Sequence, residues 1–205
     1  MTKPMFWGFA LALLLGTMGV NAQETNTFSN PTLGFTVTKP AHWQVVTAEG
    51  YSENLERVKL EDEEFQNKMQ KYAQIPFIAF MKHPEPYDDV NPSLKVNIKP
   101  LGQFLGKDSK EIIHALLPTF KQAFRNFEIV EGPKDVEIDG IQSAYVKIHY
   151  TMALPDGRTF PTCSELWIIP RGKSFFMMGI GRRQDAGTDD LEDVQQIVAS
   201  IKIDR

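Results

Sequence analysis

The chain has 205 residues, 42% of them hydrophobic, with 22 lysines and arginines against 26 aspartates and glutamates. This composition is typical of a folded domain and not of a disordered chain. The formal net charge of −4 gives no long-range attraction to phosphate backbones or anionic lipids, so we do not expect nucleic acid as a partner. The single cysteine, Cys163, has no second thiol in the chain for a disulfide.

Residues 1–22 have the pattern of a secretory signal peptide. Lys3 provides a basic start, Met5–Val20 is an uncharged apolar run, and small residues precede a cleavage site after Ala22. The run is shorter than the roughly 20 residues that a membrane-spanning helix requires, although a membrane anchor is the alternative. We therefore predict cleavage, no stable membrane insertion afterwards, and a periplasmic or secreted protein. No cysteine directly follows the run at the position where a lipid would be attached.

Removing 22 residues from 205 leaves 183, which fits one domain over residues 23–205. Its first residues, Gln23–Ser29, are polar and predict a loose leader. Gly34–Val46 then predicts a hairpin-like entry into a sheet, in which Trp43 packs in the core. Ala48–Lys59 carries no clear pattern.

The next segment predicts a helix and two strands. Acidic residues at 61–64 precede an apolar stripe of Phe65, Met69 and Tyr72 at helical spacing, so they mark a helix N-terminus better than a metal site. Ile75–Lys82 predicts a buried strand. Ser93–Lys99 alternates apolar residues with Lys95, Asn97 and Lys99, as a half-exposed strand does.

The loop between these two strands is the candidate binding site. Three prolines stiffen it around Tyr87, Asp88 and Asp89, which offer an aromatic ring and two adjacent carboxylates. The alternative is a solvated connection without function. The spacing does not match a calcium-binding loop.

Two helices have clear limits. Asp108 and Glu111 form an acidic version of the capping box before the longest helix, where Pro118 predicts a kink or break near Leu117. Its apolar stripe comprises Ile112, Leu116, Phe120 and Phe124, broadened by Ile113, Leu117 and Ala123. The last helix is predicted to be capped by Thr188 or Asp189, and its apolar face comprises Leu191, Val194, Ile197, Val198 and Ile201.

An antiparallel meander is predicted over Phe127–Arg182. Its turns are expected at Gly132-Pro133, Asp139-Gly140, Asp156-Gly157 and Arg171-Gly172. A two-residue turn at Asp156-Gly157 would place Ile148 opposite Glu165 and bury a carboxylate. A longer loop or a bulge at Pro161 would pair Val146 with Ile168, Ile148 with Leu166 and Tyr150 with Ser164. We prefer that register because it keeps the carboxylate out of the core.

The third hairpin of the meander is expected to place Ile168 near Phe175 and Leu166 near Met177, with Trp167 and Phe176 on the opposite face. Both faces of the inner strands are then apolar and need cover. The predicted fold class is α+β, an antiparallel sheet with helices on both faces.

No catalytic constellation stands out. The four histidines are scattered, which does not support a zinc site, and we expect no metal and no cofactor. One alternative is a small thiol-dependent hydrolase in which Cys163, His149 and Glu165 act as nucleophile, base and orienting group. Another is a carrier of an apolar ligand, in a pocket that Met177 and Met178 would tolerate. Gly179 and Gly181 indicate a bend or a close backbone contact, not a dinucleotide site.

The order of elements resembles the PsbP-like family. Gly34-Phe35, Pro40 and Trp43 at the N-terminus, then a helix and strand pair, a long helix, the meander and a closing helix carry this resemblance. It implies a non-enzymatic α/β/α sandwich that binds partners or supports assemblies. No residue role is carried over from the family. With the leader peptide, it predicts an exported binding module of the bacterial cell envelope whose partner is another envelope protein.

Overall fold

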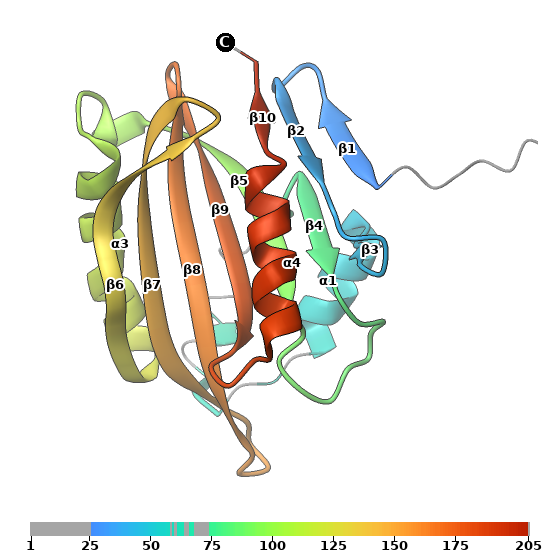
Figure 1. Cartoon of the computed structure of the whole chain (residues 1–205). Coiled ribbons are helices and arrows are strands. Elements are labelled where there is room, and N and C mark those ends of the chain that lie inside the picture. The colour runs from blue at the N-terminus through green and yellow to red at the C-terminus, as the bar shows by residue number, and fades with distance from the viewer. Residues whose placement is uncertain (1–25, 58, 60, 64–65, 68–73, 205) are drawn as a thin grey trace, which may run out of the picture.

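The computed structural model describes residues 26–57, 59, 61–63, 66–67 and 74–204 (Figure 1). The expected signal peptide and the stripe of Phe65, Met69 and Tyr72 lie outside the described residues. The strands are β1 (Thr27–Asn30), β2 (Phe35–Thr38), β3 (Gln44–Val45), β4 (Ile78–Met81), β5 (Ser93–Pro100), β6 (Arg125–Ile138), β7 (Ile141–Ala153), β8 (Thr159–Arg171), β9 (Ser174–Arg183) and β10 (Lys202–Ile203). The helices are α1 (Ala48–Arg57), α3 (Ser109–Ala123), α4 (Thr188–Ala199) and the short 3-10 helix η1 (Gly102–Phe104).

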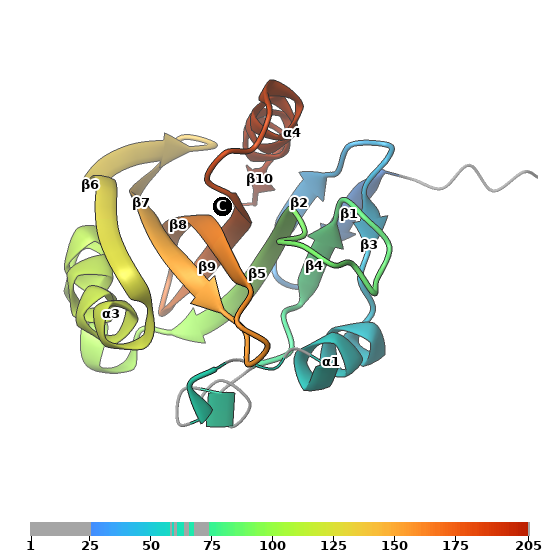
Figure 2. The ribbon, with the colours of Figure 1, turned by 90° about the horizontal axis from the view of Figure 1, so that it is seen from below.

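The strands form two sheets. The large sheet has the order β3-β4-β5-β9-β8-β7-β6, and the small sheet has the order β1-β2-β10. Every neighbouring pair is antiparallel. Figure 2 shows α4 on one side of the large sheet and α3 and α1 on the other. The predicted fold class, an antiparallel sheet with helices on both faces, is confirmed.

Each face of the large sheet carries its own core. Trp167, Phe176 and Met178 pack with Ile197 of α4 on one face, and the buried side chains of β2 and β4 join them. On the other face, Ile168 and Phe175 pack against Ile112, Ile113 and Leu117 of α3. The alternation of strand side chains between two covered faces explains why the inner strands are apolar throughout.

The meander follows the prediction at one turn and departs from it at another. Asp139 and Gly140 have φ values of 49° and 75° and connect β6 to β7 in a two-residue turn, as expected from their tolerance of positive φ. Gly132-Pro133 was predicted as a turn, which is wrong, because it lies inside β6 at a shift of register. A Cβ at Gly132 would lie 2.5 Å from the carbonyl oxygen of Tyr145, so this bulge requires glycine.

The β7–β8 hairpin keeps the predicted faces with a different register. Ile148 pairs with Ser164, and Lys147 pairs with Glu165, so the carboxylate stays off the face that Ile148 occupies. The loop is longer than two residues, as preferred, but each expected partner is two positions away, and Pro161 pairs normally without a bulge. The β8–β9 hairpin is displaced in the same way: Ile168 pairs with Met177, because Gly172 and Lys173 form the turn.

The N-terminal part differs more. β2 and β3 do not form a hairpin: β2 pairs with β1 and β10, whereas β3 pairs with β4. The supposed loose leader contains β1, whose Thr27 and Ser29 hydroxyls bond to those of Thr38 and Thr36. β1, with the sequence Thr-Phe-Ser-Asn, lacks an apolar alternation, so the sequence pattern did not reveal it.

The helix starts agree with the sequence prediction at α3 but not at α4. Asp108 and Glu111 form the predicted capping box of α3, with bonds of 2.8 and 3.0 Å. The helix continues through Pro118 to Ala123 without the expected break. At α4 the predicted side-chain cap is wrong, because the capping position is Gly187. α1 forms in the segment where no pattern was found.

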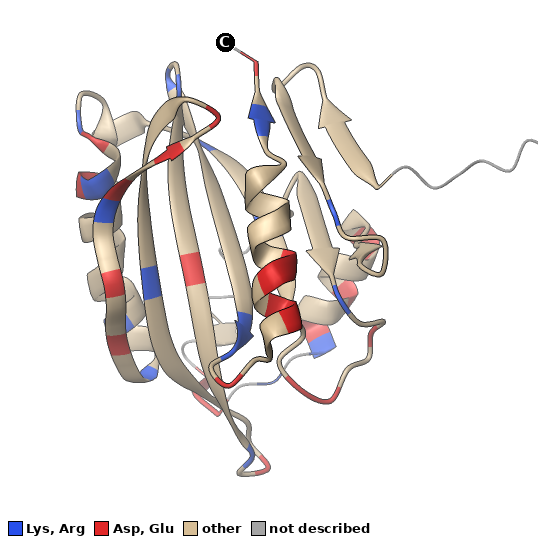
Figure 3. Cartoon of the chain, in the orientation of Figure 1, with Lys and Arg blue, Asp and Glu red and all other residues tan. Residues whose placement is uncertain are grey.

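Asp193 anchors α4 to the sheets. Figure 3 shows acidic residues gathered on the N-terminal half of α4, and the carboxylate of Asp193 is the buried one. It accepts hydrogen bonds from Trp43 Nε1 and His42 Nε2, each at 3.0 Å, and lies 3.1 Å from Lys82 Nζ. Burial alone would raise the pKa of Asp193, but the bonds from Trp43, Lys82 and His42 outweigh it and hold the pKa below its usual value. Trp43 is therefore a core residue, as predicted, with its polar edge satisfied.

Candidate binding cavity

A cavity of about 430 Å³ opens on the α3 side of the large sheet. We call it the Lys95 cavity. Its floor is formed by β5, β9, β8 and β7, and its walls by the end of α3 and the loop at residues 82–92. It is lined by Met81, Glu85, Tyr87, Asp89, Val90, Asn91, Ser93, Lys95, Phe120, Phe124, Ile148, Tyr150, Met152, Thr162, Ser164, Glu165, Leu166, Gly179, Ile180 and Gly181. The volume lies within the range of small-molecule sites.

The cavity exists because α3 covers only part of this face and because two floor positions lack side chains. Among the described residues, no atom lies within 4 Å of a Cβ placed at Gly179, and a Cβ at Gly181 would first meet Ser93 Oγ at 3.7 Å. Of the two predicted roles of these glycines, a bend or a close backbone contact, the second is not seen at Gly179 among the described residues. The missing side chains leave open space against the sheet, which larger residues would fill.

Aromatic rings form one wall. Phe124 follows the last residue of α3 and stacks on the ring of Tyr150, with centroids 3.9 Å apart. The hydroxyl of Tyr150 lies 3.0 Å from Ser164 Oγ on the neighbouring strand. Burial raises the pKa of Tyr150 despite this bond, so the hydroxyl stays protonated as a donor or acceptor. The wall is apolar with a polar edge.

Lys95 is the cationic group of the cavity. Its side chain is half-buried on β5, and its Nζ lies 5.0 Å from the centroid of the Tyr51 ring of α1. Burial lowers the pKa of Lys95, and the negative charge of Glu85 only partly opposes that effect. Within the described part of the chain, no carboxylate lies at ion-pair distance from Lys95 Nζ. The sequence pattern placed Lys95 on the solvated side of a strand and missed this role.

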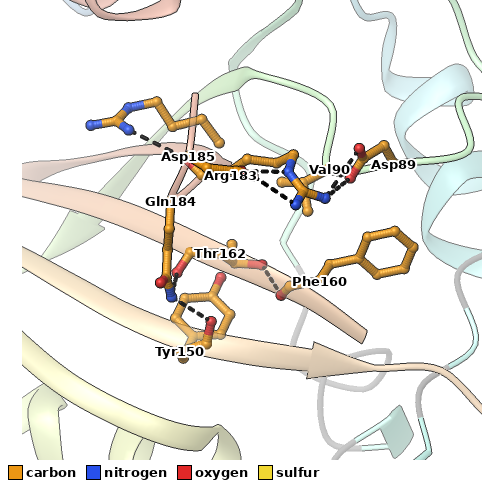
Figure 4. Close-up of polar contacts among 9 residues, drawn as sticks. Asp89, Val90, Tyr150, Phe160, Thr162, Arg183, Gln184 and Asp185 are labelled. Atoms are coloured by element: carbon orange, nitrogen blue, oxygen red, sulfur yellow. Dashed lines mark hydrogen bonds and ion pairs between the residues drawn. The ribbon is translucent and has the colours of Figure 1, made fainter. Parts of the chain in front are cut away.

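The predicted loop site lies at the rim. Tyr87 and Asp89 line the Lys95 cavity and, together with Asp88, a neighbouring cavity of about 420 Å³. Tyr87 stacks on His83 with ring centroids 4.4 Å apart. In Figure 4 the Arg183 side chain of β9 extends toward Asp89, which it contacts at 3.0 Å. The loop is thus tied to the floor of the sheet.

Arg183 also bonds to Asp185 Oδ1 at 2.6 Å, and its bonds to Asp185 and Asp89 raise its pKa. Gln184 donates to the carbonyl oxygens of Tyr150 and Thr162, at 3.1 and 3.2 Å (Figure 4). These contacts join the loop, the end of β9 and the mouth of the cavity. They support a preformed rim for a ligand.

The alternative thiol site has its residues close together but not arranged for nucleophilic attack. Cys163 pairs with His149 across β7 and β8, two positions from Glu165 on the α4 side. The thiol is buried, and burial raises its pKa, opposite to what an active nucleophile requires. Glu165 accepts bonds from Tyr145 at 2.7 Å and Arg182 at 2.9 Å. Within the part of the chain that the structure describes, no hydrogen bond joins His149 to Cys163.

Met177 and Met178, the residues of the carrier hypothesis, do not line the Lys95 cavity. They point to opposite faces of the sheet and pack in its two cores. Among the residues that the structure describes, no group of three or more histidine, cysteine, aspartate or glutamate side chains is placed to hold a metal ion. The described helices also include none with the length and apolar character to span a membrane.

Solved structures are similar to this chain in fold, whereas no sequence family matches it. No protein-family model matches the chain, and no curated protein matches its sequence. Among solved structures, cyanobacterial PsbP (CyanoP) from Synechocystis sp. PCC 6803 is similar with a TM-score of 0.51 and 14% identity, over 93% of this chain and 99% of that one. LpqN of Mycobacterium tuberculosis, described as involved in cell envelope biogenesis, is similar with a TM-score of 0.50 and 9% identity, over 90% and 88% of the two chains. At these low identities, the comparisons show similarity of fold alone.

Proposed function

We propose that the protein is an exported, non-enzymatic binding module of the bacterial cell envelope that holds a small, largely apolar ligand in the Lys95 cavity. The observation that carries the proposal is the floor at Gly179 and Gly181, which keeps about 430 Å³ open beside aromatic and aliphatic side chains. The leader-like residues 1–22 support export. LpqN, which has the same fold, supports a place in the envelope.

Filling the cavity tests this function. Gly179→Leu would place a side chain in the open space, and Gly187→Leu at the start of α4 is the control because it lies outside the cavity. We expect the neutral fluorophore N-phenyl-1-naphthylamine to bind the wild type and the control, and to bind Gly179→Leu at least about tenfold more weakly. Equal binding by all three proteins, or by none, would reject the cavity as a site.

Export has a separate test. The N-terminal sequence of protein recovered from the periplasm is expected to begin at Gln23. Recovery with Met1 intact would contradict cleavage of the leader.

A second candidate function is contact with another envelope protein through the rim loop. Its support is the fixed presentation of Tyr87, which is 38% exposed and stacked on His83, beside the anchored Asp89. A photoreactive phenylalanine analogue at Tyr87 is expected to cross-link one discrete envelope protein in intact cells. The control has the same analogue at Leu105, an exposed residue outside the loop. Identical cross-linking patterns at both positions would reject the loop as a partner site.

A further inference from the structure

Among the residues that the structure describes, no carboxylate lies at ion-pair distance from the ammonium group of Lys95. A lysine removed from water without a counter-charge is costly, and buried cations are normally paired. Around Lys95, the described residues offer the face of the Tyr51 ring, a contact that replaces part of the lost hydration. The three carboxylates that line the same cavity already have cationic partners: Asp89 pairs with Arg183, Glu85 with Arg57 and Glu165 with Arg182.

The groups around Lys95 divide the cavity into a polar and an apolar part. Ser93 lies two residues before Lys95 on β5, and it pairs across the sheet with Gly181, which itself pairs with Ser164. The hydroxyls of Ser164 and Tyr150 form one hydrogen bond with each other. One hydroxyl donates its proton to that bond, and the proton of the second hydroxyl can be donated to a further acceptor. Toward α3 the lining becomes apolar, with Phe120, Phe124, Ile148, Met152 and Leu166.

Resting on the proposed function, we propose that the ligand is an amphipathic monocarboxylate whose carboxylate pairs with Lys95 and whose apolar body lies against the aromatic wall. One lysine balances one negative charge, and the hydroxyls of the floor supply donors to the second carboxylate oxygen. The pairing gives the half-buried Lys95 a counter-charge.

Two probes of equal chain length separate this inference from the proposed function. Decanoate and 1-decanol are titrated against the full mature protein by isothermal calorimetry at neutral pH. Both are expected to bind, because both fill the apolar part, and decanoate is expected to bind about 10- to 100-fold more tightly because of the charged hydrogen bond. If neither binds, the proposed function fails. If decanol binds as well as decanoate, the cavity is a binding site but the role of Lys95 is wrong.

The variant Lys95→Met assigns the preference to one residue. It keeps the length and apolar stem of the side chain and removes the charge, so decanoate should bind about 10- to 100-fold more weakly while decanol is unaffected. Lys99→Met on the same strand is the matched control, since Lys99 pairs with Phe175 and lies outside the cavity. Retained preference for decanoate in Lys95→Met would overturn the inference, as would tighter binding of decyl phosphate than of decanoate. The decanol titration also shows that the variant is folded.

Discussion

The anchor of α4 gives a sharp test of how the two sheets and the helix are held together. In Asp193→Ala the carboxylate that accepts from Trp43 Nε1 and His42, and that faces Lys82, is removed. The indole N–H stays buried with its partner lost, which costs about 1–3 kcal/mol, and the loss of a charged acceptor brings the total to about 3 kcal/mol. For a domain of this size, that corresponds to a fall in Tm of about 6–12 °C.

Urea unfolding followed by tryptophan fluorescence measures the loss, because Trp43 itself changes environment. Glu192→Ala is the matched control: Glu192 neighbours Asp193 on α4 but is exposed, so we expect a change within about 0.5 kcal/mol. The lowered pKa of Asp193 adds a pH signature. Its stabilisation is complete above the unfolded value near 3.9 and is lost as the pH falls through the lower folded value, so wild type and variant should converge in acid. Equal losses in both variants, or a difference independent of pH, would refute the anchor.

Three further predictions concern single contacts. Asp108→Ala removes the cap of α3 and should lower the free energy of unfolding by about 0.5–2 kcal/mol in urea titrations, whereas Asp108→Ser should retain most of it. The Cys163 thiol should react with a thiol reagent such as DTNB only after unfolding, because it is buried and its pKa is raised; fast reaction in the native state would revive the thiol hypothesis. Gly132→Ala should destabilise by more than about 1 kcal/mol, because its Cβ would clash with the Tyr145 carbonyl at a positive φ; an unchanged urea midpoint would show that the bulge can relax.

The sequence predicts that helices cover both faces of the sheet. This prediction needs only the observation that the inner strands carry apolar residues on both faces. Strand periodicity fixes which face a side chain occupies, and this survived in β7 and β8 even though the register differs by two positions. The exact partner depends on loop geometry around Asp156-Gly157, which alternation does not encode. Local chemistry was equally informative at Asp108 and Asp139, where short-range bonds and backbone strain decide the structure.

The candidate site was harder to predict because the cavity depends on positions without side chains and on where α3 stops covering the sheet. Gly179 and Gly181 were noticed, but the volume they leave open depends on where α3 ends, a long-range property. Lys95 follows a regular alternation that predicts exposure to water, but Tyr51 of α1, a helix without a recognisable sequence pattern, lies against its side chain. The rim loop was predicted as a surface feature, and its contact with Arg183 links residues 94 positions apart.

The small sheet has a consequence for the timing of folding. β2 pairs with β1 on one side and with β10 on the other, and the bond between Thr38 N and Ser200 Oγ spans 162 residues. Closing so long a loop is entropically slow, and high contact order slows folding. The small sheet is therefore complete only when residues 202–203 have paired with β2. A chain truncated after Ser200 lacks β10, so its β2 has no partner on that edge, and this chain should be more sensitive to protease than the chain that retains β10.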